Sequence, residues 1–141
     1  MPSASVPVCK KFPGNYRELE RIATFVLGHA RKLPFNSKQL YAIELSVDEA
    51  CSNIIDHAYH GEGVGEIFVS LELREASIVI VLEDHGCRFD PGEVGEPDLT
   101  SPLQARRERG LGVYTIHRLM DEVRFDFSKP GVNRLQMIKQ L

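Results

Sequence analysis

Polar side chains recur along one predicted helix at a spacing that would bring them to one face. This polar stripe consists of Ser46, Glu49, Asn53, Asp56 and His60, each three or four residues after the last. Glu49 and Asn53, one turn apart, can present a carboxylate and an amide oxygen to the same small volume, as a proton acceptor beside a Mg²⁺ ligand requires. An ordinary surface helix is the alternative, because it too shows a polar stripe opposite an apolar one. Spacing alone does not decide between them.

A second group of polar residues follows the most apolar run of the chain. Asp84, at the end of that run, can accept a hydrogen bond from an exocyclic amine such as that of adenine. Gly86, two residues later, would let the backbone approach a flat ligand. The alternative is a plain turn, because Asp and Gly favour turns for conformational reasons.

A third group is the segment Arg106-Arg107-Glu108-Arg109-Gly110-Leu111-Gly112. Glycines at a helix amino terminus expose backbone N–H groups to an anion, and the arginines add positive charge, so the segment could hold phosphates. A solvated charge run before an ordinary helix is the alternative, since a lone Gly-x-Gly is weak evidence.

Three helices that would position these groups are predicted from apolar residues at helical spacing. The first covers about residues 15–33. The second, which carries the polar stripe, begins after Asn36 or Ser37, either of which can cap it, and ends before Gly61. The third opens at Gly110.

Strands are predicted where the apolar pattern changes to alternation. An edge strand lies near residues 5–12, a hairpin joins 67–73 to 77–82, and two further strands cover 123–127 and 134–141. The second hairpin strand is apolar on both faces and is therefore predicted to be central. Together these elements predict an α+β two-layer sandwich, in which a mixed, mostly antiparallel sheet is covered on one face by helices.

Composition narrows the function classes. The chain of 141 residues is predicted to form one domain, residues 1–141, and its net charge of -3 shows no basic excess that would attract nucleic acid. Apolar runs such as residues 78–82 are too short to cross a bilayer, and residues 1–5 lack the pattern of a signal peptide. A cytoplasmic protein that binds neither nucleic acid nor membrane is expected.

The cysteines give no framework for a disulfide or zinc site. Cys9, Cys51 and Cys87 are odd in number and widely spaced, so free thiols are predicted. Cys87 lies beside the predicted adenine site and is either a redox-sensitive group or, as the sequence favours, a small side chain that fills a turn.

The order of the three groups resembles a known superfamily. The chain resembles the ATPase superfamily that includes gyrase, MutL and histidine kinases. Its N, G1 and G2 boxes are matched here, in order, by Glu-x-x-x-Asn on a helix, by Asp-x-Gly after a strand and, after a long segment, by Gly-x-Gly at a helix start. Residues 47–59 resemble the N box of the anti-sigma-factor serine/threonine kinases nearly position by position. Residues 109–116 and 119–123 are similarly close to their G2 segment and to the stretch directly after it, and the resemblance extends through the whole chain.

The resemblance implies an ATP- and Mg²⁺-dependent protein kinase. Glu49 would be the catalytic base, Asn53 would coordinate Mg²⁺, and Asp84 would recognise the adenine amine. Residues 92–108 would form a lid over the nucleotide, and Arg106 or Arg109 would neutralise the phosphates. The residues assigned to ATP binding are Asn53, Asp84, Gly86, Arg109, Gly110, Leu111 and Gly112.

The resemblance also implies partners. The kinase would phosphorylate an anti-sigma-factor antagonist, otherwise bind a sigma factor, and form a homodimer.

One departure from the family pattern is Arg88, which stands where many superfamily members have a second glycine in the G1 box. The main alternative is a module of the same fold that binds nucleotide and switches partners without phosphotransfer. A histidine-kinase fragment is disfavoured, because the chain shows no helical hairpin with a phosphoacceptor histidine.

Overall fold

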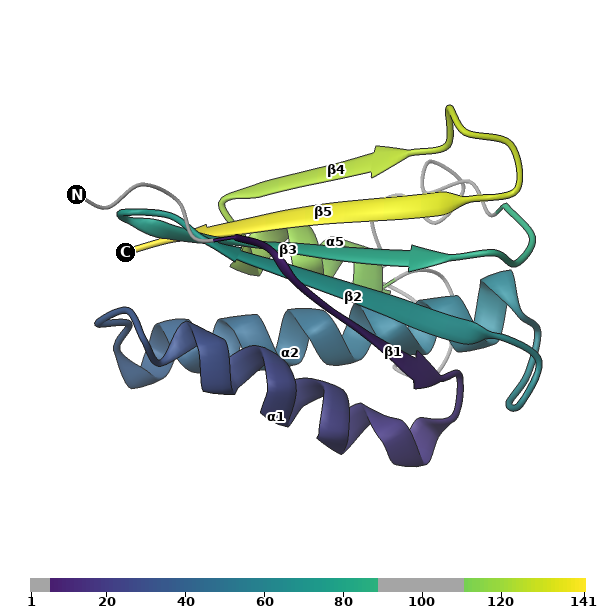
Figure 1. Cartoon of the computed structure of the whole chain (residues 1–141), viewed down its shortest axis with the longest axis horizontal. Coiled ribbons are helices and arrows are strands. Elements are labelled where there is room, and N and C mark those ends of the chain that lie inside the picture. The colour runs from purple at the N-terminus through teal and green to yellow at the C-terminus, as the bar shows by residue number, and fades with distance from the viewer. Residues whose placement is uncertain (1–5, 89–110) are drawn as a thin grey trace, which may run out of the picture.

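A computed structural model describes residues 6–88 and 111–141 of the chain. The expected α+β architecture is confirmed, with helices on one face of a five-stranded sheet (Figure 1). The helical elements are the 3-10 turn Tyr16–Glu18, α1 (Leu19–Ala30), α2 (Ser37–Asn53), the π-helical segment Ile54–Ala58 and α5 (Leu111–Leu119). The strands are β1 (Val8–Pro13), β2 (Glu66–Leu73), β3 (Ser77–Asp84), β4 (Glu122–Asp126) and β5 (Asn133–Gln140).

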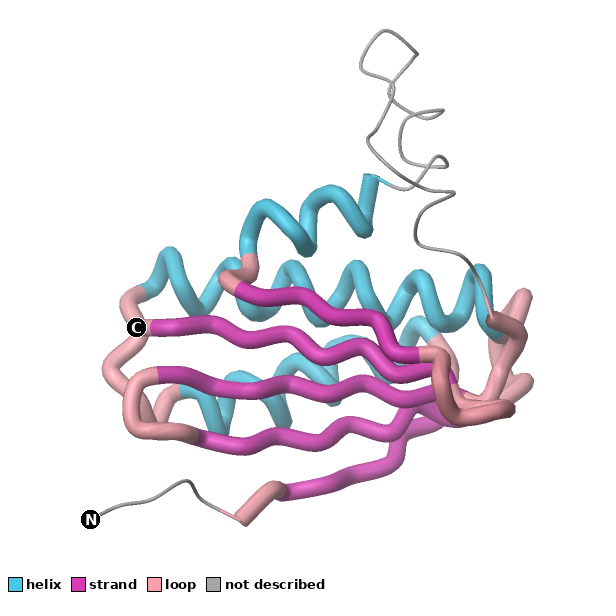
Figure 2. Tube along the Cα trace, turned by 90° about the horizontal axis from the view of Figure 1, so that it is seen from above, coloured by secondary structure: helices cyan, strands magenta, loops and turns pink. Residues whose placement is uncertain are grey.

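The strands lie in the order β1-β2-β3-β5-β4, and every neighbouring pair is antiparallel. Figure 2 shows this single sheet with the helices behind it. The predicted edge position of β1 and the central position of β3 are confirmed. The parallel pairing that a mixed sheet would need is not present among the described strands.

The central strand β3 is buried on both faces. Its residues Ile78, Ile80 and Leu82 are at most 1% exposed and belong to the main core, which includes the buried positions of α1 and α2. Side chains alternate along a strand, so Val79 and Val81 face the other way, where they form a small cluster with Ile138. Each fully buried aliphatic side chain contributes about 1.5–3 kcal/mol. The core therefore holds β3, and with it Asp84 at its end, in a fixed position.

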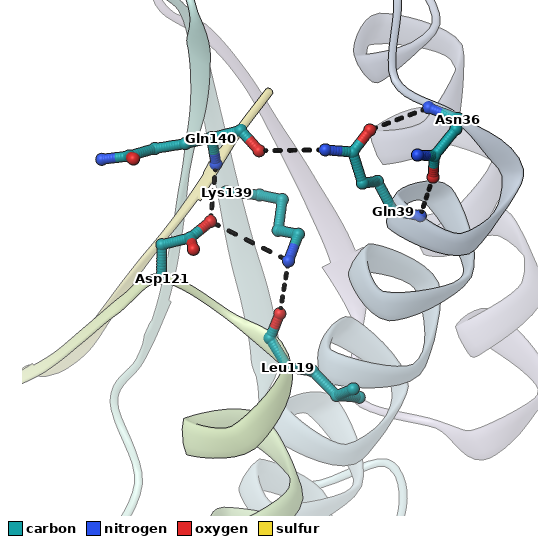
Figure 3. Close-up of polar contacts among 6 residues, drawn as sticks. All are labelled: Asn36, Gln39, Leu119, Asp121, Lys139 and Gln140. Atoms are coloured by element: carbon teal, nitrogen blue, oxygen red, sulfur yellow. Dashed lines mark hydrogen bonds and ion pairs between the residues drawn. The ribbon is translucent and has the colours of Figure 1, made fainter.

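Asn36 is the residue that caps α2. Its side-chain Oδ1 accepts a hydrogen bond from the backbone N–H of Gln39 at 2.7 Å, and the Gln39 Oε1 accepts one from the Asn36 N–H at 2.8 Å (Figure 3). This reciprocal arrangement is a capping box. The Gln39 Nε2 also donates to the Gln140 carbonyl at 3.3 Å, which ties the start of α2 to the end of β5.

The carboxyl end of α5 is anchored to the same strand. The Lys139 ammonium donates to the Leu119 carbonyl at 2.8 Å and lies 3.8 Å from the Asp121 carboxylate (Figure 3). The Asp121 carboxylate in turn accepts from the Gln140 N–H at 2.8 Å. A cation at a helix carboxyl end satisfies its free carbonyls and opposes the negative end of its dipole. These contacts fix how α5 lies on the sheet.

The second helix differs from the prediction at its carboxyl end. It does not run regularly to Gly61 but changes after Asn53 to a π-helical segment, in which the Tyr59 N–H donates to the Ile54 carbonyl at 2.9 Å. A π-turn holds one more residue than an α-turn and shifts every later side chain around the axis. His60, two residues after this segment, has a φ of 57°, a left-handed conformation.

The thiol prediction is confirmed. Cys9, Cys51 and Cys87 are free, and burial raises the pKa of the Cys51 thiol well above its usual range. Across the described residues, no helix has both the length and the apolar character needed to span a bilayer.

Replacement of Asn36 tests the cap. Asn36→Ala should lower the free energy of unfolding by about 1 kcal/mol, because the Gln39 N–H loses its side-chain acceptor. Ser37→Ala is the matched control and should change stability by less than about 0.5 kcal/mol, since Ser37 is exposed at the next position. Urea denaturation of both variants measures the difference. Equal losses would mean that the two residues share the cap.

Candidate functional site

A pocket lies where the carboxyl ends of α2 and β3 meet the end of β4 and the start of β5. These strand ends lie together on the right of Figure 1. The pocket brings together Asn53 and Asp84, which the sequence predicted to share a site. Its lining residues are Ala50, Asn53, Ile54, Leu82, Asp84, Phe125, Phe127, Asn133, Arg134 and Leu135.

Asp84 is the buried charged group of this pocket. It is 2% exposed, and its Oδ1 accepts hydrogen bonds from the Gly86 N–H at 3.0 Å and from the Asn133 Nδ2 at 2.7 Å. Burial raises the pKa of the Asp84 carboxyl, whereas the hydrogen bonds from Asn133 and Gly86 act in the opposite direction. The two hydrogen bonds therefore hold the carboxyl group in one orientation beside the pocket.

The loop after β3 is packed tightly on the π-helical segment. The Cys87 N–H donates to the Ala58 carbonyl at 2.7 Å. A Cβ on Gly86 would lie 2.4 Å from the Ala58 oxygen, so only glycine fits there. The sequence predicted that Gly86 lets the backbone approach a ligand. The close approach that the structure shows is to the protein's own backbone.

Tyr59 holds the other side of the same loop. Its hydroxyl accepts from the His85 N–H at 3.0 Å and donates to the Glu66 carbonyl at 2.5 Å. Burial is the main cause that raises the pKa of Tyr59, so the phenol keeps the proton that it donates. The π-helical segment, the start of β2 and the loop after β3 are thus tied together through one side chain.

Glu49 and Asn53 occupy successive turns near the end of α2. Both are half-buried, and neither side chain forms a hydrogen bond with another described residue. Asn53 lines the pocket, and Glu49 lies one turn before it. Burial, followed by the neighbouring carboxylates of Glu44 and Glu49, raises the pKa of Asp48 on the same helix. The end of α2 is therefore rich in acceptor groups.

The other three residues of the polar stripe do not line the pocket. Asp56 accepts a hydrogen bond from the Tyr16 hydroxyl, and His60 is exposed beyond the π-turn. Ser46 is fully buried, and its Oγ has no partner among the described residues. The stripe is thus not one continuous polar face, because the π-turn rotates Asp56 and His60 out of line and Ser46 packs inside.

Arg88, which stands at the position of the second G1-box glycine, does not line the pocket. Its guanidinium lies over the Phe127 ring, 4.6 Å from the centroid, and the Phe127 ring is stacked on Phe125 at 6.1 Å. Both phenylalanines line the pocket. A cation over an aromatic face is a favourable contact, so Arg88 borders the apolar wall of the pocket from outside.

The phosphate-binding prediction falls largely outside the described residues. Arg109 and Gly110 lie there, as do Arg106 and the predicted lid at 92–108. Leu111 and Gly112 lie in α5, which confirms a helix here, whereas its predicted start at Gly110 lies outside the described residues.

Sequence reasoning missed the residues that β4 and β5 bring to the pocket. Asn133 lies directly opposite Asp84 in the β3–β5 register, Phe125 lies in β4, and Phe127 comes directly after that strand. The alternation of Phe125 and Phe127 indicates a strand but not what it faces. No local signal marks Asn133, because its place beside Asp84 depends on strand register.

Comparisons with known proteins show the family of the chain. Residues 12–139 match the family model for the histidine kinase-like ATPase domain. The chain is 33% identical over 117 residues to serine-protein kinase RsbW from Bacillus cereus, which covers 80% of this chain and 72% of that kinase. The kinases of the same name from Bacillus anthracis and Bacillus thuringiensis are equally similar.

A solved structure shares the fold. The crystal structure of the RsbU and RsbW domains of a Mycobacterium tuberculosis protein matches 97% of this chain with a TM-score of 0.67, at 13% sequence identity. The matched part is 33% of that longer chain. At this identity the likeness shows the fold alone.

Because Gly86 lies so close to Ala58, the addition of a single methyl group at Gly86 should destabilise the protein. Gly86→Ala should lower the free energy of unfolding by about 1–3 kcal/mol, because the new methyl group meets a backbone carbonyl that is itself hydrogen-bonded. Gly28→Ala is the matched control. Gly28 is exposed within α1, nothing lies within 4 Å of its Cβ position, and the change should stabilise by about 0.5–1 kcal/mol. Chemical denaturation measures both, and a neutral Gly86→Ala would contradict the packing described.

Proposed function

The chain belongs to the histidine kinase-like ATPase family and, within it, to the anti-sigma-factor serine/threonine kinases, and from that premise we propose that it transfers a phosphoryl group from ATP to a partner protein. The observation that carries this proposal is the pocket in which Asn53 of α2 and the buried Asp84 of β3 lie together. In one small volume it supplies a hydrogen-bond acceptor for the adenine amine, on Asp84, and an oxygen ligand for a metal ion, on Asn53.

In the proposed complex the adenine lies against the buried end of the pocket. Its exocyclic amine donates to the Asp84 carboxylate, which is 2% exposed and held by two hydrogen bonds. Ile54, Leu82 and Phe127 supply apolar surface for the flat ring. A pocket that is mostly apolar with a few fixed polar groups is the usual form of a small-molecule site.

Asn53 would hold Mg²⁺ through its amide oxygen. The described residues contain no group of three or more His, Cys, Asp or Glu side chains that could hold a metal ion by themselves. That composition fits Mg²⁺, which keeps several waters and is bound mainly through nucleotide phosphates and one or two protein ligands. The ion would neutralise phosphate charge, and Asn53, free of other described partners, is available to it.

Glu49 would act as the base. In phosphoryl transfer the hydroxyl oxygen of the substrate forms a bond to the γ-phosphorus, the bond to ADP breaks, and the hydroxyl proton passes to an acceptor. Glu49 lies one helical turn before Asn53, so its carboxylate can take that proton beside the metal. Arg109, Gly110, Leu111 and Gly112 are proposed to bind the phosphates.

The proposed partners are inferred from the relatives. The proteins that match are named serine-protein kinase RsbW. We assign to this chain a serine or threonine on an anti-sigma-factor antagonist as substrate, a sigma factor as second partner, and a homodimer as the working form.

Thermal unfolding with ADP and Mg²⁺ tests the nucleotide site. At about a hundred times the dissociation constant, ADP should stabilise the protein by about 2.7 kcal/mol and raise Tm by several degrees. Asp84→Asn should lose most of this shift, because an amide is a weaker acceptor for the adenine amine. Glu122→Gln, on the exposed side of β4, is the control and should keep it. No shift in the unmodified protein would sink the nucleotide assignment.

Phosphotransfer separates a kinase from a binding module. Glu49→Gln should keep the thermal shift with ADP and lower transfer from radiolabelled ATP to an antagonist protein by about 10²–10⁴-fold. Glu44→Gln, also a half-buried carboxylate of α2, is the control and should keep transfer. Intact ADP binding with no transfer by the unmodified protein would favour the module that switches partners without phosphorylation.

A further inference from the structure

The Asn133 side chain forms polar contacts in addition to the backbone hydrogen bonds by which β5 pairs with β3. It is the first residue of β5, is 7% exposed, and lies opposite Asp84 in the register. Its side-chain Nδ2 lies 2.7 Å from Asp84 Oδ1, 3.2 Å from the Gly86 carbonyl and 3.3 Å from the Cys87 carbonyl. All three partners are acceptors, so the amide must direct its NH₂ group toward them and its oxygen away.

This contact decides which oxygen of Asp84 faces the pocket. Oδ1 accepts from both Asn133 and the Gly86 N–H, which uses its two lone pairs. Oδ2 accepts from no described residue. Asp84 lines the pocket together with Asn53 and Asn133. Oδ2 is therefore the oxygen that meets a ligand.

We propose that Asn133 is a positioning residue that makes the site selective for a base with an exocyclic amine, because it occupies Asp84 Oδ1 and directs an ionised Oδ2 into the pocket. This inference rests on the proposed nucleotide function. An ionised carboxylate only accepts hydrogen bonds, so it favours the 6-amine of adenine and repels the 6-carbonyl of hypoxanthine. A protonated carboxyl can donate to that carbonyl, and the selectivity is then lost.

The charge state of Asp84 depends on a small set of neighbours. Burial favours the protonated carboxyl, and the Asn133 hydrogen bond is the largest opposing effect on its pKa. The charged or titratable groups nearby are His85, next in the chain, Tyr59, directly after the π-helical segment, and Arg134, whose guanidinium pairs with Glu83 at 4.0 Å. None of them donates a hydrogen bond to the Asp84 carboxylate. Without Asn133, the pKa of Asp84 should rise.

The test compares ADP with IDP, which differ at the 6-position of the base. Dissociation constants are measured by calorimetry over about pH 5 to 8. The unmodified protein should prefer ADP. Asn133→Ala should reduce the ADP-to-IDP preference by about tenfold and move the acid loss of ADP binding to higher pH, since binding needs the ionised form. Asn133→Thr, which keeps a donor, should restore part of both effects.

Two further measurements make the test decisive. NMR titration of the Asp84 carboxyl carbon in the ligand-free protein should show that its pKa is higher in Asn133→Ala than in the unmodified protein. Gln136→Ala, on the outward face of β5, is the matched control and should change neither pKa nor selectivity.

The outcomes separate the inference from the function. If Asn133→Ala weakens ADP and IDP equally at every pH and leaves the Asp84 titration unchanged, Asn133 has a structural role alone and the inference is wrong. If the unmodified protein binds neither nucleotide, the proposed function fails and the selectivity inference fails with it. An unmodified protein that binds ADP and IDP equally overturns the inference while the nucleotide site stands.

Discussion

The candidate site depends on one close contact between two backbones. The π-helical segment after α2 presents the Ala58 carbonyl to the loop after β3, where the Cys87 N–H donates to it and Gly86 leaves room for the approach. Tyr59 fixes the same loop through its hydroxyl. The last carbonyls of a helix have no partner within the helix, and the Ala58 carbonyl finds one in the loop after β3. The π-turn thus lets the helix that carries Asn53 and the strand that carries Asp84 meet at one pocket.

The sheet and the far end of the molecule support this contact. The β3–β5 pairing sets Asn133 opposite Asp84, so the orientation of one carboxylate follows from the register of two strands. At the other end, Lys139 holds the carboxyl end of α5 to β5. A rigid sheet with anchored helices keeps polar groups within the small tolerance that ligand binding and phosphoryl transfer require.

Much of the fold could be predicted from local pattern. The strand at 77–82 is apolar on both faces and is central in the sheet, and the cap of α2 was narrowed to two residues, of which Asn36 is the one. The prediction that the five residues of the polar stripe share one helix face was less reliable, because it assumed a constant helical period. The period changes after Asn53, and Asp56 consequently bonds Tyr16 instead of joining the site.

The sequence by itself determined the element order through periodicity and indicated the family through the resemblance of short motifs. It also predicted that Asn53 and Asp84 share a site, and both line one pocket. Tertiary structure alone decided the role of Gly86 in packing, the position of Arg88 over Phe127, and the contact between Asn133 and Asp84. These depend on which strands pair, in which register, and how closely a loop approaches a helix. Such relations join residues distant in the chain, and no local pattern records them.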